Sequence, residues 1–185
     1  MKIGKNIVMS LAFGLSLAAV PTQGFAALPQ GAKAPEFALS AALGGKEFRL
    51  SLQKELKKGP VVLYFFPAAF TSGCTVEAHL FAKATGDFNK LGASVIGVTA
   101  GNVERVTEFS KSECRNRFAV AADPGAKVAA KFDTTMQAAK RTISNRTSFV
   151  IAPNGTILLS YTDMNPQAHI AKTLAAVRAW KARHG

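Results

Sequence analysis

The chain contains only two cysteines, Cys74 and Cys114, and they form no Cys-x-x-Cys pair. This absence argues against a dithiol–disulfide exchange enzyme and against zinc fingers, because both need closely spaced cysteines. The histidines, His79, His169 and His184, form no metal-ligand pattern either. The sequence therefore predicts no metal site; we expect His79 on a helix surface and His169 in the solvated first turn of a helix.

Acidic residues are scarce, with 11 Asp and Glu against 23 Lys and Arg and a formal net charge of +12. Such an excess can mark a nucleic-acid-binding protein. Here the basic residues are scattered rather than striped, and no RNA- or DNA-binding motif is present, so we expect no nucleic-acid partner. Weak attraction to an acidic redox partner or an acidic membrane surface fits the charge better.

Long apolar runs are absent except near the N-terminus. There Lys2 and Lys5 precede the apolar run Ile7 to Val20, and the small residues of Gly24-Phe25-Ala26 follow. A basic segment, an apolar segment and a small-x-small site are typical of a secretory signal peptide.

We expect cleavage after Ala26, which gives a signal peptide of residues 1–26 and a single mature domain of residues 27–185. The alternative is a retained membrane anchor, but the run is short for a spanning helix and is interrupted by Pro21. The signal type suggests a bacterial periplasm, with no membrane insertion after cleavage.

Hydrophobic periodicity predicts strands that alternate with helices, followed by a hairpin and a last helix. This order is typical of a three-layer α/β domain. The expected strands are 37–39 and 47–50 (a hairpin), 61–66, 93–99, 118–121, 148–152 and 156–161. The expected helices are 72–89, 102–116 with Asn102 as its N-cap, a short one carrying Val128 and Phe132, and one that starts at Asn165-Pro166. Residues 54–59 and 136–145 are expected as a turn and a loop.

Cys74 has the most informative position in the chain. A buried apolar strand ends at Pro67, a short turn contains Thr71, and Cys74 falls in the first turn of the following helix. Unpaired backbone N–H groups and the helix dipole favour a thiolate there, and the thiolate is the reactive form. Pro67 can shield one side of the sulfur, and the hydroxyl of Thr71 can bond an acceptor beside it.

A nearby guanidinium would stabilise that thiolate further. Arg146 is the best candidate, because it immediately precedes a buried strand and can project from the strand end. Arg141 is the second choice. Glu77, one turn after Cys74, can orient Arg146 or the local backbone, and Phe70 can line the mouth of the pocket.

These residues resemble the active-site motif of the peroxiredoxins, Pro67-x-x-x-Thr71-x-x-Cys74. The surrounding strand, the segment Cys74-Thr75-x-Glu77 and the later Arg146-Thr147-Ser148-Phe149-Val150-Ile151 are similar to the bacterioferritin-comigratory-protein (Q) type of that family. The resemblance covers roughly Gly31 to Trp180, nearly all of the expected mature chain.

The resemblance implies a thioredoxin fold, α/β/α layers around a central mixed sheet with an N-terminal hairpin, and a peroxidase mechanism without a cofactor. It makes Cys74 the peroxidatic residue, which attacks hydrogen peroxide or an alkyl hydroperoxide and becomes a sulfenic acid. By the same resemblance, Thr71 and Arg146 hold the peroxide and Pro67 shields the product. Donors arranged around the developing alkoxide would lower the barrier.

One position departs from the family pattern. Many relatives carry a resolving cysteine five residues after the first, where this chain has His79. Some relatives resolve from the next helix, and Cys114 lies on that expected helix, so we expect Cys114 to attack the Cys74 sulfenate and form an intramolecular disulfide. A permanent Cys74–Cys114 disulfide and a bystander thiol, which would give a one-cysteine peroxidase recycled by a small thiol, remain as alternatives.

The expected partners are a peroxide substrate and a thioredoxin-like reductant, and the type of peroxiredoxin favours a monomer. A thiol–disulfide oxidoreductase on the same fold would need a second cysteine near Cys74, where Thr75-Val76-Glu77 stands instead. A copper-binding assembly factor would need closely spaced cysteines and a partnering histidine, which the sequence does not supply. A non-catalytic, disulfide-stapled binding protein is the remaining class.

Overall fold

The computed structural model describes residues 27–184, so the expected signal peptide lies outside the described residues. The strands are β1 (Ala38–Leu43), β2 (Lys46–Ser51), β3 (Val61–Ala68), β4 (Ser94–Gly101), β5 (Ala119–Ala122), β6 (Thr135–Ala138), β7 (Arg141–Ser144), β8 (Thr147–Ile151) and β9 (Ile157–Thr162). The α-helices are α1 (Leu52–Leu56), α2 (Ser72–Lys90), α3 (Val106–Ser112), α4 (Lys127–Lys131) and α5 (Pro166–His184). The short 3₁₀ helices are η1 (Val103–Arg105) and η2 (Pro124–Ala126).

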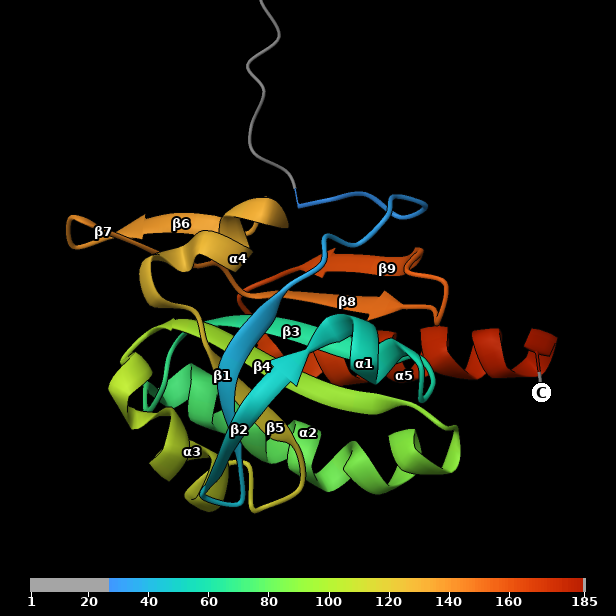
Figure 1. The fold of residues 1–185 in the computed structure, drawn as a ribbon, viewed down its shortest axis with the longest axis horizontal. Coiled ribbons are helices and arrows are strands. Elements are labelled where there is room, and N and C mark those ends of the chain that lie inside the picture. The colour runs from blue at the N-terminus through green and yellow to red at the C-terminus, as the bar shows by residue number, and fades with distance from the viewer. Residues whose placement is uncertain (1–26, 185) are drawn as a thin grey trace, which may run out of the picture.

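A mixed sheet of seven strands, in the order β2-β1-β5-β4-β3-β8-β9, forms the centre of the fold (Figure 1). The strands β3, β4 and β5 are parallel to one another, and the pairs β1–β2, β1–β5, β3–β8 and β8–β9 are antiparallel. The central strand β3 is buried over its first six residues, as expected for a strand covered on both faces. The expected α/β fold with a central mixed sheet and an N-terminal hairpin is confirmed.

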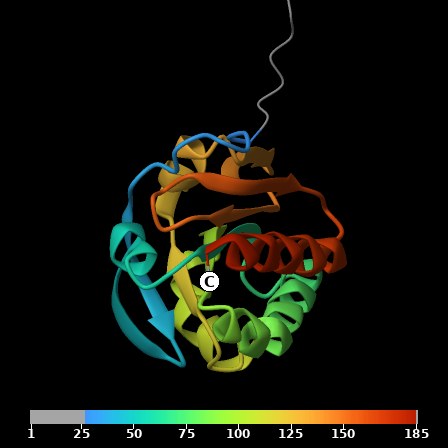
Figure 2. The same cartoon turned by 90° about the vertical axis from the view of Figure 1, so that its right-hand side faces the viewer.

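The two faces of the sheet pack against different helices. Val62, Tyr64 and Phe66 of β3 join one apolar cluster with residues of α2, α3 and α5. Val61 and Leu63 alternate to the other face, where they pack with residues of α1 and α4. Figure 2 shows α2 and α5 side by side on one face and α1 on the other, so the domain has three layers.

Three local expectations are wrong. Residues 54–59 were expected as a turn, but α1 occupies 52–56, because Ser51 caps it by accepting from the Lys54 N–H. Residues 136–145 were expected as a loop, but β6 and β7 form a hairpin whose tip residues, Ala139 and Lys140, adopt positive φ. The helix expected to reach residue 116 ends at Ser112, because Arg115 and Asn116 are left-handed.

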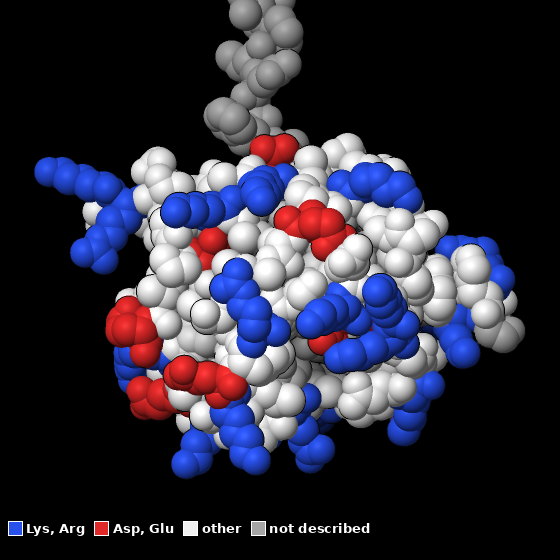
Figure 3. Space-filling view, viewed as in Figure 1, with Lys and Arg blue, Asp and Glu red and all other residues white. Residues whose placement is uncertain are grey.

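Within residues 27–184, no helix is both long enough and apolar enough to cross a membrane. The same residues contain no group of three or more His, Cys, Asp or Glu side chains placed to hold a metal ion. On the face drawn in Figure 3, Lys and Arg side chains are dispersed over the surface rather than gathered into one stripe.

Candidate active site

Cys74 lies in the first turn of α2, shortly after the end of β3. It is the third residue of α2, and its side chain is only 1% exposed. The first intrahelical bond, from the Thr75 N–H to the Thr71 carbonyl at 2.9 Å, leaves the preceding N–H groups without helical partners. The sulfur is therefore buried at the positive end of a helix of 19 residues.

Arg146 reaches this sulfur from the residue just before β8. Its Nη2 lies 3.4 Å from the Sγ of Cys74, and its Nη1 contacts the Oε2 of Glu77. Because Glu77 is one turn after Cys74 on the same helix face, the Arg146 guanidinium contacts both side chains. Arg146 is 3% exposed and Glu77 is fully buried, so the contact is shielded from water. Arg141, the second candidate, is an exposed residue of β7.

Gly73 makes room for that guanidinium. A Cβ atom at this position would lie 3.1 Å from the Nη2 of Arg146, closer than ordinary van der Waals contact. Glycine is a poor helix former, so its presence in the first turn of α2 has a steric reason. Sequence reasoning missed Gly73, although a glycine directly before Cys74 was a visible signal.

Pro67 lies near the end of β3, and Thr71 is the N-cap residue of α2. The Thr71 hydroxyl donates to the Ala68 carbonyl at 3.1 Å, which leaves lone pairs of its oxygen able to accept a proton from a bound molecule. Pro67 was expected to end the strand, but β3 continues to Ala68. Pairing with β8 stops at Phe65, so the missing N–H of Pro67 interrupts no ladder bond on that side.

Phe70 lies on the same turn and is partly buried with φ of 65°. Its ring packs edge-on against Phe109 at 5.1 Å between centroids, and the Arg105 guanidinium lies 3.8 Å from its centroid. Asn102 occupies the expected N-cap position, that of η1, but its side chain makes no capping bond and instead donates to the Ala69 carbonyl at 2.8 Å. Neighbouring loops thus hold the turn that carries Thr71.

Burial dominates the electrostatics around Glu77. It raises the pKa of the carboxyl to about 8, although the Arg146 guanidinium favours the charged form. The Oε2 atom contacts Arg146, whereas the Oε1 atom has no hydrogen-bond partner. The carboxyl therefore carries its proton more readily than an exposed glutamate would.

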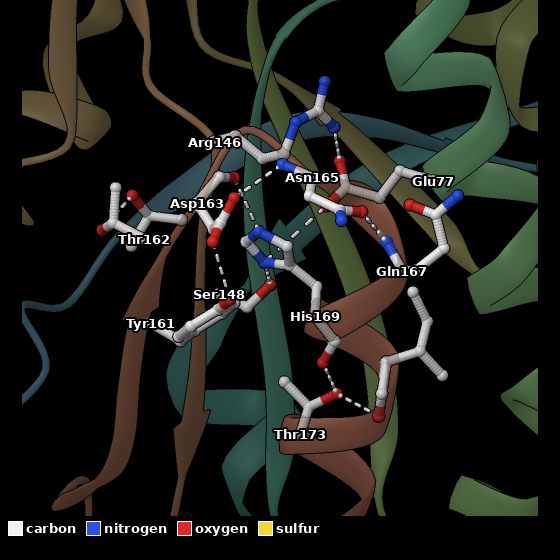
Figure 4. A network of polar contacts seen from close by, with 12 residues as sticks. Glu77, Arg146, Ser148, Tyr161, Thr162, Asp163, Asn165, Gln167, His169 and Thr173 are labelled. Carbon is white, nitrogen blue, oxygen red and sulfur yellow. Dashed lines mark hydrogen bonds and ion pairs between the residues drawn. The ribbon is translucent and has the colours of Figure 1, made fainter.

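His169 approaches the free oxygen of Glu77 from α5 (Figure 4). Its Nδ1 lies 3.8 Å from the Oε1 of Glu77 and 2.8 Å from the Oγ of Ser148, and its Nε2 lies 2.9 Å from the Asp163 carbonyl. The sequence predicted a solvated residue in the first turn of a helix. That prediction is wrong: His169 is fully buried, because the start of α5 packs against β8 and α2.

Cys114 occupies a different setting, the turn that follows α3. Its side chain is fully buried, both cysteines are free thiols, and its N–H donates to the Phe109 carbonyl at 3.0 Å. Burial raises the pKa of the Cys114 thiol well above its usual range, and the adjacent Glu113 adds to that effect. A permanent Cys74–Cys114 disulfide is absent from this structure.

His79 connects the two cysteine-bearing segments. Its Nε2 lies 2.8 Å from a carboxylate oxygen of Glu113, so α2 is linked to the residue before Cys114. Sequence reasoning gave His79 a surface role and did not find this partner. The pairing holds the turn of Cys114 against the helix of Cys74.

Comparisons with known proteins agree with this geometry. Residues 30–160 match the model of the AhpC/TSA family. The chain is 33% identical to a chloroplastic peroxiredoxin Q of Gentiana triflora, over 81% of this chain and 67% of that one. It is 32% identical to peroxiredoxin Q of Sedum lineare, over 85% and 82% respectively.

A solved structure, peroxidoxin BcpB from Mycobacterium tuberculosis, superposes with a TM-score of 0.74 at 30% identity, covering 81% of this chain and 96% of that one. AhpC of the same organism superposes with a TM-score of 0.72 at 17% identity, covering 85% and 96%, and this likeness concerns the fold alone.

Proposed function

The chain belongs to the AhpC/TSA family and is a peroxiredoxin, a thiol-dependent peroxidase, and on that premise we propose that Cys74 is its peroxidatic cysteine. The observation that carries this assignment is the contact of 3.4 Å between the Nη2 of Arg146 and the Sγ of Cys74 at the start of α2. A positive charge and a helix N-terminus both favour a sulfur anion.

The first step transfers one oxygen atom. The Cys74 thiolate attacks the terminal oxygen of the hydroperoxide, an S–O bond forms, the O–O bond breaks, and the departing alkoxide or hydroxide takes up a proton. The Arg146 guanidinium donates to the oxygen on which charge develops, and the Thr71 oxygen accepts from the hydroperoxide O–H. Pro67 and Phe70 limit access to the resulting sulfenic acid, which favours the reversible stage of cysteine oxidation.

Cys114 resolves the sulfenic acid in the second step. The Cys114 thiol attacks the Cys74 sulfur, an S–S bond forms, and the hydroxyl leaves as water with the thiol proton. The raised pKa of the buried Cys114 thiol keeps it a poor nucleophile in place. The turn after α3 must therefore open before the bond can form, together with the first turn of α2.

A thioredoxin-like dithiol returns the enzyme to its reduced state by two thiol–disulfide exchanges. The excess of basic residues suits an acidic reductant. A signal peptide of residues 1–26 would place the reaction in the periplasm, and the domain is proposed to act as a monomer. The N-terminal residue of the exported protein, expected to be Ala27, and its mass in solution test these two assignments.

Mass spectrometry tests the chemistry directly. Reduced protein treated with a small excess of hydrogen peroxide should lose both thiols and about 2 Da, the two hydrogens removed by disulfide formation. The Cys74→Ser variant should not react. The Cys114→Ser variant should react once and retain a trappable sulfenic acid; a disulfide-free product in wild type would instead favour a one-cysteine peroxidase recycled by a small thiol.

A further inference from the structure

A row of buried polar groups connects the sulfur of Cys74 to helix α5. From Cys74 it runs through Arg146 and Glu77 to His169, with heavy-atom separations of 3.4 Å at the first step and 3.8 Å at the last. Each of these four side chains is at most 3% exposed. His169 is the member that the peroxidase chemistry described above does not use.

The hydrogen bonds of His169 define its tautomer. The Asp163 carbonyl can only accept, so the Nε2 atom carries a proton and donates to it at 2.9 Å. Burial lowers the pKa of the imidazole, so the ring is neutral near pH 7 and its Nδ1 atom is an acceptor. The Ser148 hydroxyl donates to this atom at 2.8 Å.

The Oε1 atom of Glu77 is an unpartnered polar atom in a fully buried side chain, and it faces this same Nδ1 atom. A charged oxygen without a partner is costly in the interior. A proton on Oε1 would be donated to the His169 Nδ1 after a small approach of the two groups and a rotation of the Ser148 hydroxyl, because the single lone pair of Nδ1 accepts one hydrogen bond at a time. The imidazole of His169 would thus be a second hydrogen-bond partner for the Glu77 carboxyl, besides Arg146.

We propose that His169 is a positioning residue for the peroxidase reaction: through Glu77 it holds the Arg146 guanidinium against the Cys74 sulfur and sets how much of the guanidinium charge Glu77 neutralises. When Oε1 carries a proton, the charge of Arg146 is available to the sulfur anion and to the departing oxygen. When Glu77 is ionised, the carboxylate and the sulfur compete for one cation. The inference rests on the proposed role of Cys74.

The pH dependence of this arrangement follows from the groups around the imidazole. As pH rises through about 8, Glu77 ionises, so the peroxide reaction should weaken on the alkaline side. The titratable and polar groups that face His169 come from every element packed against it. They are Glu77 of α2, Arg146 just before β8, Ser148 of β8, Tyr161 of β9, Asp163 of the loop before α5, and Lys172 of α5, which acts through Asp163 and Tyr161.

Two amide substitutions distinguish the contact of His169 with Glu77 from its hydrogen bond to the Asp163 carbonyl. The His169→Gln variant can keep the bond to the Asp163 carbonyl but loses the ring atom that faces Glu77. The His169→Asn variant keeps a polar atom near the Nδ1 position and loses the bond to Asp163. We expect His169→Gln to lower the rate constant for peroxide by about 10- to 100-fold, as small misplacements of catalytic groups do, and His169→Asn to retain most of it.

The matched control is Thr173→Val. Thr173 is fully buried on the same helix and donates to the His169 carbonyl at 2.7 Å, but it does not touch the imidazole. This variant should keep the wild-type rate and pH profile. The His169→Gln variant should also move the alkaline decline of the rate to lower pH, which a loss of packing alone would not do.

A double-mutant cycle with Glu77→Gln completes the test, measured as the rate of peroxide consumption in competition with a reporter peroxidase. If His169 acts through Glu77, adding His169→Gln to Glu77→Gln should cause little further loss. Additive losses in the double variant would overturn the proposal. So would a wild-type rate in His169→Gln together with a lowered rate in His169→Asn. Failure of the Cys74 assignment is distinguishable, because Cys74→Ser would then retain the wild-type rate.

Discussion

Cys74 and Cys114 belong to the same apolar cluster and are equally hidden from solvent, yet their surroundings oppose each other. Cys74 begins a long helix and touches a guanidinium. Cys114 follows the end of a short helix, beside the carboxylate of Glu113, and burial raises its pKa. The difference indicates that the charges around a buried sulfur, rather than burial itself, distinguish Cys74, the proposed peroxidatic residue, from Cys114.

The largest expected effect comes from removing the cation of Cys74. Arg146→Met should lower the rate constant for peroxide by about 100- to 1,000-fold, as loss of one charge-stabilising donor does in other active sites. Stopped-flow oxidation of Cys74 measures it. Arg141→Met, at an exposed position of β7, is the matched control and should leave the rate unchanged.

Arg146→Met also leaves the buried carboxyl of Glu77 without its hydrogen-bond partner, which destabilises the fold. Combining it with Glu77→Gln replaces the carboxyl by a neutral amide, so that the double variant carries no titratable group at this position. If the double variant folds and still reacts with peroxide at the wild-type rate, the Arg146 guanidinium does not set the reactivity of Cys74 apart from that of Cys114.

Gly73→Ala is a smaller perturbation of the same contact. The added methyl group lies 3.1 Å from the Arg146 Nη2 and should displace it, so we expect about tenfold slower oxidation of Cys74. Gly86→Ala, in the same helix with open space around its Cβ, is the control: it should stabilise the protein by up to about 1 kcal/mol without changing the rate. Equal rates in both variants would show that the guanidinium position is unimportant.

Glu77 makes the free energy of unfolding of the protein depend on pH. Its pKa is about 8 in the folded protein against a model value of 4.5, so the folded state binds the proton more tightly. This contribution is fully present below pH 4.5 and is lost as pH rises to about 8. Urea denaturation should show the stability of Glu77→Gln rising relative to wild type over this interval, and a difference independent of pH would contradict the assignment.

The smallest expected effect concerns the opening of the Cys114 turn. His79→Ala removes the contact of 2.8 Å between the His79 Nε2 and the Glu113 carboxylate, a partly exposed pair worth up to about 1 kcal/mol. Disulfide formation after oxidation should become about two- to fivefold faster, whereas oxidation of Cys74 itself stays unchanged. Glu108→Gln, which breaks the exposed pair with Arg105, should alter neither step. An unchanged resolution rate in His79→Ala would mean that this turn does not limit the second step.

Local sequence predicted the part of the site that lies within one strand–turn–helix unit. Cys74, Thr71 and Glu77 are fixed relative to one another by the start of one helix, so their spacing carries their geometry. Arg146 is distant in sequence, but the continuous apolar run that follows it indicated a buried strand whose end could face the same site.

The rest depends on packing between distant elements. His169 sits in a polar first turn that looks solvent-exposed, and only the contact of α5 with α2 and β8 buries it. Helix α3 ends before Cys114 because Arg115 and Asn116 adopt left-handed backbone conformations. Asparagine has some preference for that conformation, but arginine has little. The β6–β7 hairpin turns at Ala139 and Lys140, which are not typical turn residues, so no local signal marked it.

Trapping of the first oxidation product tests the central assignment most directly. The Cys114→Ser variant, exposed to one equivalent of hydrogen peroxide in the presence of dimedone, should acquire a single dimedone adduct, which peptide mapping assigns to Cys74. The Cys74→Ser variant should acquire none at Cys114. An adduct on Cys114 at a comparable rate, or peroxide consumption by Cys74→Ser that equals wild type, would contradict the account.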